Sequence, residues 1–219
     1  DLKPEPVEDT AMDEASQYFR RMKLLGTGKL TADALAITAQ LALFSGSSRD
    51  AGASKAGVAA LQRYHGLPHG AFSADPYLAG RNPARSSDLT PVCAQLEALY
   101  DLLCASGSAA YAERMQRIVE NVLKGALPEN GVCETQAVNR LAADDTCRPV
   151  PAKPAQTTAL LKALYAVRRS VWMVKSESET VLYLPYTASC LTRMDGTPVR
   201  LAAQANGANT VTVTVETKQ

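Results

Sequence analysis

Apolar residues recur at helical spacing in six stretches of the chain. Within each stretch they return every three or four residues, so they would share one face of an α-helix. The predicted helices cover residues 15–25, 35–44, 56–64, 92–103, 111–123 and 159–171. The pattern therefore predicts a mainly helical chain up to residue 171.

Two of these helices end in the same way. ALAITAQLALFSGS (34–47) and QLEALYDLLCASGS (95–108) both run from apolar, alanine-rich sequence into Ser-Gly-Ser, and an amphipathic segment follows each. Gly46 and Gly107 stand where a helix C-terminus favours a left-handed residue, after which the next helix can fold back antiparallel. Repeated helical hairpins of this kind are typical of helical arrays and α/α toroids.

After Trp172 the apolar period becomes alternating. VWMVK, TVLYLPYT, PVRLAAQ and NTVTVTVET are rich in β-branched or aromatic residues, and the turn signals DGTP and NGAN lie between them. In the last run the threonines at 210, 212 and 214 share one face and the valines at 211, 213 and 215 the other, which predicts a strand with one solvated side. These residues are expected to form a small antiparallel β-sheet, part of a β-sandwich.

These patterns divide the chain into three parts. Residues 1–12 suit a flexible N-terminus, residues 13–171 form the predicted helical domain with long loops at 65–90 and 124–154, and residues 172–219 form the sheet. The start DLKPEPVEDT is acidic and contains proline, unlike the basic and then apolar sequence of a signal peptide. It would suit a mature N-terminus left after cleavage, so we expect export to the periplasm or the cell exterior.

Composition narrows the class of partner. The 219 residues include 23 Lys plus Arg and 22 Asp plus Glu, a balance that indicates neither a nucleic-acid nor an acidic membrane partner. The most apolar run, 34–44, is about half the roughly 20 residues that span a bilayer. We therefore expect no membrane partner.

The loop between the third and fourth predicted helices contains both histidines of the chain. Its aromatic and leucine side chains could hold it in place, which favours an ordered loop that lines a site. His65 and His69 are four apart, but the glycines and proline around them disfavour a helical metal pair, and histidines bonded to backbone are the simpler interpretation. The candidate ligand contacts are polar or aromatic groups that suit a hydroxyl-rich partner: Tyr64, His65, His69, Asp75, Tyr77 and Arg81.

Two carboxylates of this loop are candidates for catalysis. Asp75 and Asp88 could flank a sugar as an acid and a base or nucleophile, which need a separation of about 5–10 Å. Asp88 has a simpler use, because it precedes a helix whose first turn contains Pro91, as expected of a helix cap. Trp172, Tyr183 and Tyr186 could stack on sugar rings, although their position favours a role in the core.

Five cysteines are scattered without CxxC spacing: Cys93, Cys104, Cys133, Cys147 and Cys190. Structural or free thiols are the favoured interpretation, and a Cys133–Cys147 disulfide or metal ligation is the alternative. The sequence contains no phosphate-binding glycine loop, GxSxG or HExxH, so nucleotide, α/β-hydrolase and zincin chemistry lack support.

One stretch resembles a known family. RYHGLPHGAFSADPYLAGRNP (63–83), a helix, and then SGSAAYAERMQRIVENVL (106–123) are similar to the helical domain of the β-L-arabinofuranosidases, glycoside hydrolase family 127, and its bacterial branch. Weaker matches continue through QAVN (136–139) to VWMVKSESETVLYLPYTAS (171–189). The resemblance implies an (α/α)6 toroid with β-sandwich domains that cleaves L-arabinofuranosides through a cysteine nucleophile at a zinc site and a glutamate acid/base.

The catalytic positions of that family are poorly preserved. The resemblance puts its acidic residue at Pro76, its Glu-x-Cys zinc ligands at Asp88, Leu89 and Thr90, and its paired cysteines near Ala155 and Gln156. Threonine is a poor replacement for a soft thiolate. Because nucleophile, metal and acid act as a unit, their joint loss disfavours the ancestral reaction.

We therefore expect a reduced relative of these hydrolases, mainly α with a β appendage, that binds an arabinose-containing glycan or serves as an accessory protein without zinc-cysteine catalysis. No cofactor is expected, and zinc would be expected only if cysteines such as Cys93 or Cys147 formed a site. One alternative is an active hydrolase that uses Asp75 and Asp88, or Cys147 as a relocated nucleophile. Another is a structural protein, because six helices cannot close a twelve-helix ring and the open helical edge could mediate homo-oligomerisation.

Overall fold

The computed structural model describes residues 27–72, 78, 80–81, 89–124, 127, 132–133, 149–150, 154–207 and 210–217. In these ranges the helices are α2 (Gly28–Ser45), α3 (Ser48–His65), α4 (Leu89–Ser106), α5 (Ala109–Ile118), which continues as the π-helical segment η1 (Val119–Leu123), and α7 (Pro154–Arg169). They confirm five of the six predicted helices. The predicted helix at 15–25 and much of the predicted loops at 65–90 and 124–154 lie outside the described residues.

All five helices begin earlier than the apolar pattern predicted, and α2, α3 and α7 do so by five residues or more. The first two turns of α3 are largely polar, so they lack an apolar stripe, and α7 begins at Pro154, whose ring suits the first turn of a helix. The start of α2 is fixed by a cap, because the Thr27 hydroxyl accepts a hydrogen bond of 3.3 Å from the Leu30 N–H. Capping and backbone chemistry therefore set these boundaries.

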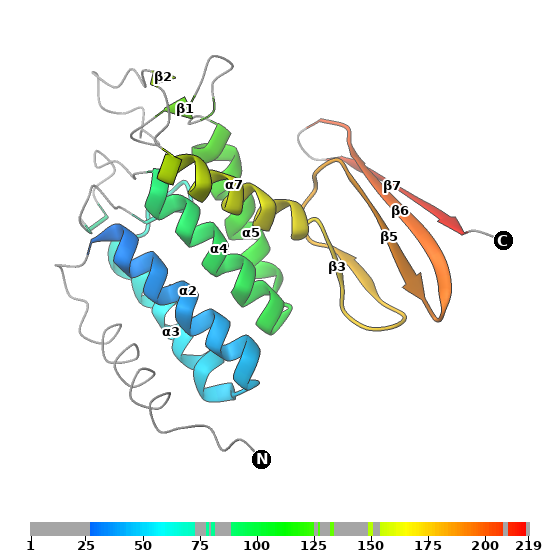
Figure 1. Ribbon diagram of the computed structural model, residues 1–219, viewed down its shortest axis with the longest axis horizontal. Coiled ribbons are helices and arrows are strands. Elements are labelled where there is room, and N and C mark those ends of the chain that lie inside the picture. The colour runs from blue at the N-terminus through cyan, green and yellow to red at the C-terminus, as the bar shows by residue number, and fades with distance from the viewer. Residues whose placement is uncertain are drawn as a thin grey trace.

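The helices form two layers (Figure 1). One layer holds α2, α4 and α7, with α4 in contact with both of the others, and the second holds α3 and α5. Gly46 and Gly107 adopt left-handed φ values of 61° and 62° at the ends of α2 and α4, and each donates its N–H to the carbonyl four residues earlier. Both predicted reversals are therefore confirmed, and they produce the hairpins α2–α3 and α4–α5.

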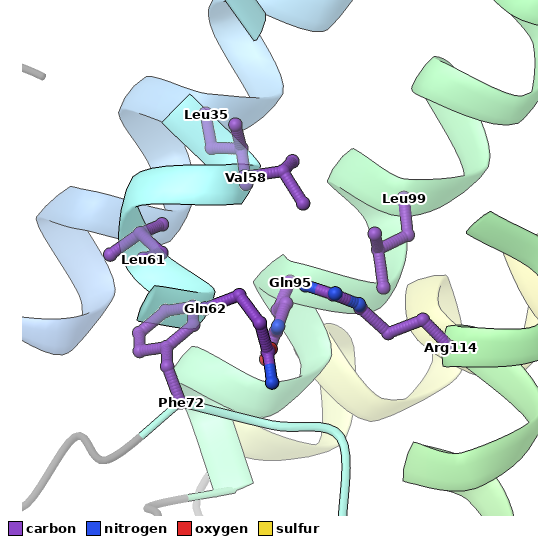
Figure 2. Close-up of a pocket in the computed structure, with 8 residues that line it drawn as sticks. All are labelled: Leu35, Val58, Leu61, Gln62, Phe72, Gln95, Leu99 and Arg114. Carbon is purple, nitrogen blue, oxygen red and sulfur yellow. The ribbon is translucent and has the colours of Figure 1, made fainter. Parts of the chain in front are cut away.

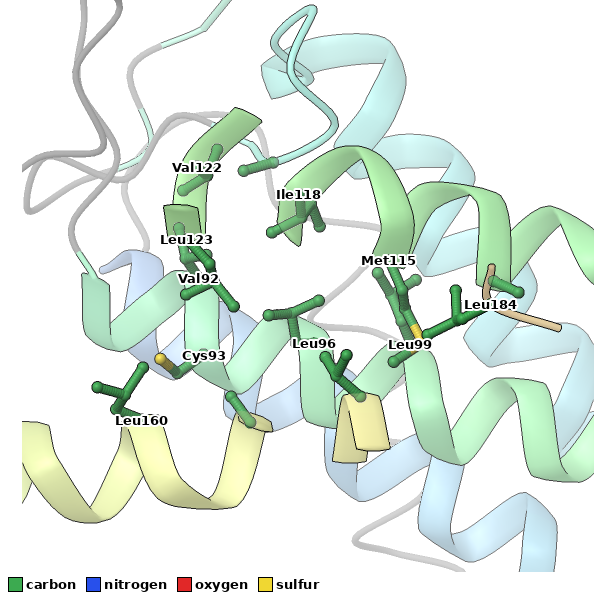
Figure 3. Close-up of a cluster of buried hydrophobic side chains, with 14 of the residues drawn as sticks. Val92, Cys93, Leu96, Leu99, Met115, Ile118, Val122, Leu123, Leu160 and Leu184 are labelled. Atoms are coloured by element: carbon green, nitrogen blue, oxygen red, sulfur yellow. The ribbon is translucent and has the colours of Figure 1, made fainter. Parts of the chain in front are cut away.

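The hydrophobic core lies on both sides of α4. One cluster joins α4 to α5 and α7, and Figure 3 shows its leucine and valine side chains converging between these helices. A second cluster joins α4 to α2 and α3 through Leu35, Leu61 and Leu102. The π-helical turn of η1 lets the consecutive residues Val122 and Leu123 both be buried in the first cluster.

Beyond α7 the chain forms two antiparallel sheets. Strand β3 (Trp172–Val174) pairs with β4 (Thr180–Leu182), and β5 (Ala188–Met194), β6 (Thr197–Ala205) and β7 (Val211–Thr217) form a sheet in that order. The predicted DGTP turn is confirmed: Asp195 and Gly196 both have positive φ and join β5 to β6. Strand β5 was not predicted, because ASCLTRM contains few β-branched residues. A further short pair joins β1 (Val132–Cys133) to β2 (Pro149–Val150).

The prediction that the valine face of β7 is buried is wrong. The pairing register places Val213 and Val215 beside the buried Ala203 and Leu201 of β6, yet their side chains are 46% and 59% exposed. All but one of the residues of β7 are exposed, so little packs on either face of the strand, and both sides are solvated where one was expected.

Aromatic side chains attach the first sheet to the helices. The Tyr183 hydroxyl donates a 2.8 Å hydrogen bond to the Gly107 carbonyl, and the Trp172 indole donates to the Ala188 carbonyl at 3.2 Å. Both rings, and that of Tyr186, pack on the larger core cluster. This supports the expected core role of the three rings. In the described part of the chain, no helix has the length and apolar character that crossing a bilayer requires.

Candidate functional site

The candidate site is built at the C-terminal end of α3. The helix ends at His65, whose side chain is only 2% exposed, and its Nδ1 accepts a 3.0 Å hydrogen bond from the N–H of Gly80. This bond ties a distant part of the loop back to the helix from which the loop departs. His65 therefore holds the loop in place, which is the backbone-bonding interpretation of this histidine.

A compact turn follows the helix. Gly66 and Phe72 form an antiparallel bridge, and the Leu67 N–H donates to the Ala71 carbonyl at 2.9 Å. Leu67, Ala71 and Phe72 are buried, so the start of the loop is anchored in the core. The predicted ordered loop is confirmed for these residues.

His69 lies at the tip of this turn. Its Nδ1 accepts a 3.3 Å hydrogen bond from the Ala71 N–H, which fixes the orientation of the ring. Gly70 has φ 97°, and the turn lies so close to α5 that a Cβ at Gly70 would be 3.0 Å from Arg117 Cβ. Only glycine tolerates both this positive φ and this close approach. The packing of the turn against α5 therefore fixes the position of His69.

The two histidines have the same protonation chemistry. Because both Nδ1 atoms accept hydrogen bonds, the neutral rings carry their protons on Nε2. Both Nε2 atoms are buried, and neither has a hydrogen-bond partner in the part of the chain that the structure describes. Burial lowers the pKa of both imidazoles, which favours the neutral form. The site therefore holds two uncharged, buried N–H donors.

The other predicted contacts are distributed unevenly. Tyr64 is 56% exposed, and the guanidinium carbon of Arg63 lies 5.4 Å from the centre of its ring. Arg81 is exposed next to Gly80. Asp75, Tyr77, Asp88 and Cys147 lie outside the described residues, so the carboxylate separation on which the hydrolase alternative depends stays untested.

Sequence reasoning missed a polar pocket lined by side chains of α2, α3, α4 and α5. Gln62, Gln95 and Arg114 point into it among apolar side chains (Figure 2). These side chains leave no room for a water molecule, so the pocket is a packed polar contact and not a small-molecule site. The sequence did place one polar residue, Gln95, on the apolar face of α4, which indicates a buried polar contact. Its partners lie on other helices, so the sequence alone could not identify them.

The described cysteines do not resemble metal ligands or nucleophiles. Burial, and then the charge of Glu97, raises the pKa of Cys93 to about 12, so it is a thiol at neutral pH. Burial also raises the pKa of Cys104 and Cys190, and all three are free. Among the described residues no three His, Cys, Asp or Glu side chains gather as a metal site would require. The side chain of Cys133, like Cys147, lies outside the described residues, and so does the predicted disulfide.

The N-termini of α4 and α7 lie at the same end of their layer (Figure 1). The first turn of α4 carries Thr90, and the first turn of α7 carries Ala155 and Gln156. These are the positions at which the resemblance puts a zinc ligand and the paired cysteines. The fold brings them to one end, but a hydroxyl, a methyl group and an amide replace the thiolates.

A comparison with solved structures finds a similar fold. The crystal structure of Ara127N-Se, a GH127 β-L-arabinofuranosidase from Geobacillus stearothermophilus T6, matches 91% of this chain with a TM-score of 0.73 and 17% sequence identity. The match covers 35% of that protein, so this chain spans about a third of its length. No protein-family model and no curated protein matches the chain. The expected partial resemblance and the toroid-like helical fold with a small β part are therefore confirmed.

Proposed function

We propose that this protein is a reduced relative of the GH127 β-L-arabinofuranosidases that binds carbohydrate, or acts as an accessory to its processing, without zinc-cysteine catalysis. One observation carries the proposal. The ends of α4 and α7 lie together, but Thr90, Ala155 and Gln156 occupy the positions at which the family resemblance expects thiolates. The base of the loop is held by the hydrogen bonds of His65 and His69, which supports a proposal that keeps the binding loop and drops the nucleophile and the metal.

Binding would use the groups that the loop base presents. Tyr64 offers an exposed ring and Arg81 an exposed cation, while His65 and His69 lie behind them and hold the loop through their Nδ1 atoms. Asp75 and Tyr77 would complete the contacts from the same loop. We propose an arabinose-containing glycan as the ligand, and an exported location.

Titration calorimetry of the full chain with an arabinose-containing oligosaccharide tests the proposal. Saturable binding should occur, and replacing His69 and Asp75 by alanine should abolish it. Replacing the exposed Leu191 of β5 with alanine provides a control that should bind as the wild type does. Binding that survives both loop changes would remove the loop from the proposal.

Turnover of a nitrophenyl arabinofuranoside decides between binding and catalysis. A reduced relative should leave the substrate intact. Turnover that is lost in the Asp75→Asn, Asp88→Asn or Cys147→Ser variant would instead establish an active hydrolase and identify its reacting group.

A specific observation also favours an assembly role. Leu30, Ile37 and Phe44 are spaced seven residues apart on α2 and are 61%, 54% and 90% exposed. Such a stripe is the open helical edge through which two copies could associate. Analytical ultracentrifugation should then show a concentration-dependent dimer that the Phe44→Ser variant weakens. A monomer at all concentrations would exclude this candidate.

A further inference from the structure

A second cluster of aromatic and charged side chains lies on α4 and α7, away from the loop. The guanidinium carbon of Arg169, in the last turn of α7, lies 5.2 Å from the ring centre of Tyr100 and 5.5 Å from that of Tyr165. Both contacts place the cation over a ring, so each tyrosine covers part of the guanidinium. Arg169 is thereby held in one orientation, with its N–H edge as the part left for hydrogen bonding.

A carboxylate and an amide accompany this cation. Asp101 of α4 lies near enough to Arg169 to interact with it electrostatically, and Gln40 of α2 lies close to the same carboxylate. The surface around Arg169 therefore carries a cation and a carboxylate beside two aromatic rings.

A purely structural role, in which the contacts only join two helices, explains just part of the cluster. Stacking on Tyr100 joins α7 to α4, but Tyr165 lies on the same helix as Arg169 and is 64% exposed. With Arg169 over its ring, Tyr165 still presents a large apolar area to solvent. Leu161, one turn earlier on α7, is 62% exposed and extends this area.

The combination suits one class of ligand. Aromatic rings stack on the C–H faces of sugars, and planar charged or amide groups bind vicinal hydroxyls as donors and acceptors. The neighbouring charges are mixed, because Glu97 lies near Lys162 as Asp101 lies near Arg169. A nearly neutral field favours an uncharged saccharide over an anionic one.

We propose that Tyr165, Arg169 and Asp101 form a second saccharide-contact surface, which takes a neutral, hydroxyl-rich sugar unit. The inference rests on the proposed carbohydrate function for its ligand class, but it uses a different set of residues. Tyr165 stacks on the sugar ring, Arg169 donates to one hydroxyl and Asp101 accepts from its neighbour. A chain glycan held at both surfaces gains affinity because its second contact is intramolecular.

Calorimetry with linear arabinotetraose tests this surface in the full chain. Tyr165→Ala should weaken binding about threefold to tenfold, the range expected for a lost aromatic contact. Tyr165→Phe keeps the ring and should bind as the wild type does. Arg169→Lys keeps the charge but loses the planar guanidinium, so it should weaken binding as much as Tyr165→Ala. Leu191→Ala truncates an exposed side chain of β5 that belongs to neither surface, and should have no effect.

The outcomes separate this inference from the proposed function. If His69→Ala weakens binding and Tyr165→Ala does not, the second surface is absent and the loop site stands. If tetragalacturonate binds more tightly than arabinotetraose and Arg169→Lys removes the difference, the assignment to neutral sugars is wrong. If the wild type binds neither saccharide, the proposed function fails and this inference fails with it. Circular dichroism of each variant confirms that a lost affinity does not reflect a lost fold.

Discussion

Replacing Gly70 with alanine tests how tightly the base of the loop is held. Gly70 has φ 97°, and an added Cβ would lie 3.0 Å from Arg117 Cβ and 3.3 Å from Ile118 Cγ1. Both neighbouring atoms belong to α5, whose backbone hydrogen bonds fix their position. The variant must therefore strain the turn or displace it from the helix.

The expected cost has two parts. A left-handed backbone costs a residue with a Cβ about 1–2 kcal/mol, and forcing a methyl group into packed space costs about 1–3 kcal/mol. The free energy of unfolding should therefore fall by about 2–5 kcal/mol. Gly46→Ala is the matched control, because Gly46 has φ 61° with no atom within 4 Å of an added Cβ. Only the backbone part applies there, about 1–2 kcal/mol.

Urea unfolding followed by circular dichroism measures both variants against the wild type. The Gly70 variant should have the lower midpoint, with an unchanged dependence on denaturant. Equal losses in the two variants would refute the reasoning, because they would show that the turn does not pack against α5 as described. The same variant should also lose affinity in the calorimetry with the oligosaccharide, since His69 depends on this turn.

Two further predictions concern titratable groups. Burial lowers the pKa of His65 and His69 below the ordinary value of 6.5, so the unfolded chain binds protons at these rings more readily than the folded chain does. Acid therefore favours unfolding: the free energy of unfolding has its full value above about pH 6.5 and falls as the pH drops below it. Chemical unfolding at about pH 7.5 and 5.5 should show a smaller acid loss in a His65→Gln, His69→Gln variant, and equal losses would mean that the rings are not buried as neutral groups. Cys93, with a pKa of about 12, should resist iodoacetamide at about pH 8 until the chain unfolds, as measured by peptide mass spectrometry. Rapid labelling of the native chain would contradict its burial and restore it as a candidate zinc ligand.

Local patterns predicted the helices because each one buries a stripe of its own sequence. They failed where stability comes from elsewhere, as in the polar first turns of α3 and in β5, whose order depends on pairing with β6. The valine face of β7 could be placed by alternation, but its exposure depends on which neighbours the sheet has. Alternation therefore predicts which residues share a face and says nothing about what covers it.

Contacts between helices limited the prediction of the site in the same way. The histidines were recognised because glycine and proline around them signal a turn, and that signal also indicated their bonds to backbone. Arg169 contacts Tyr100, which lies more than 60 residues earlier in the sequence, and side chains of four helices line the pocket around Gln95. No local pattern brings such residues together, so only the packing of the layers reveals them.

The buried donors of His65 and His69 show what these rings contribute to the fold. A buried N–H without an acceptor costs about 1–3 kcal/mol, and in the described part of the chain both Nε2 groups are in this state. Each ring offsets part of that cost through Nδ1, which accepts a hydrogen bond from a backbone N–H and so holds the loop in place. Because neither Nε2 is accessible, a sugar at the proposed site would contact this region through exposed groups such as Tyr64 and Arg81.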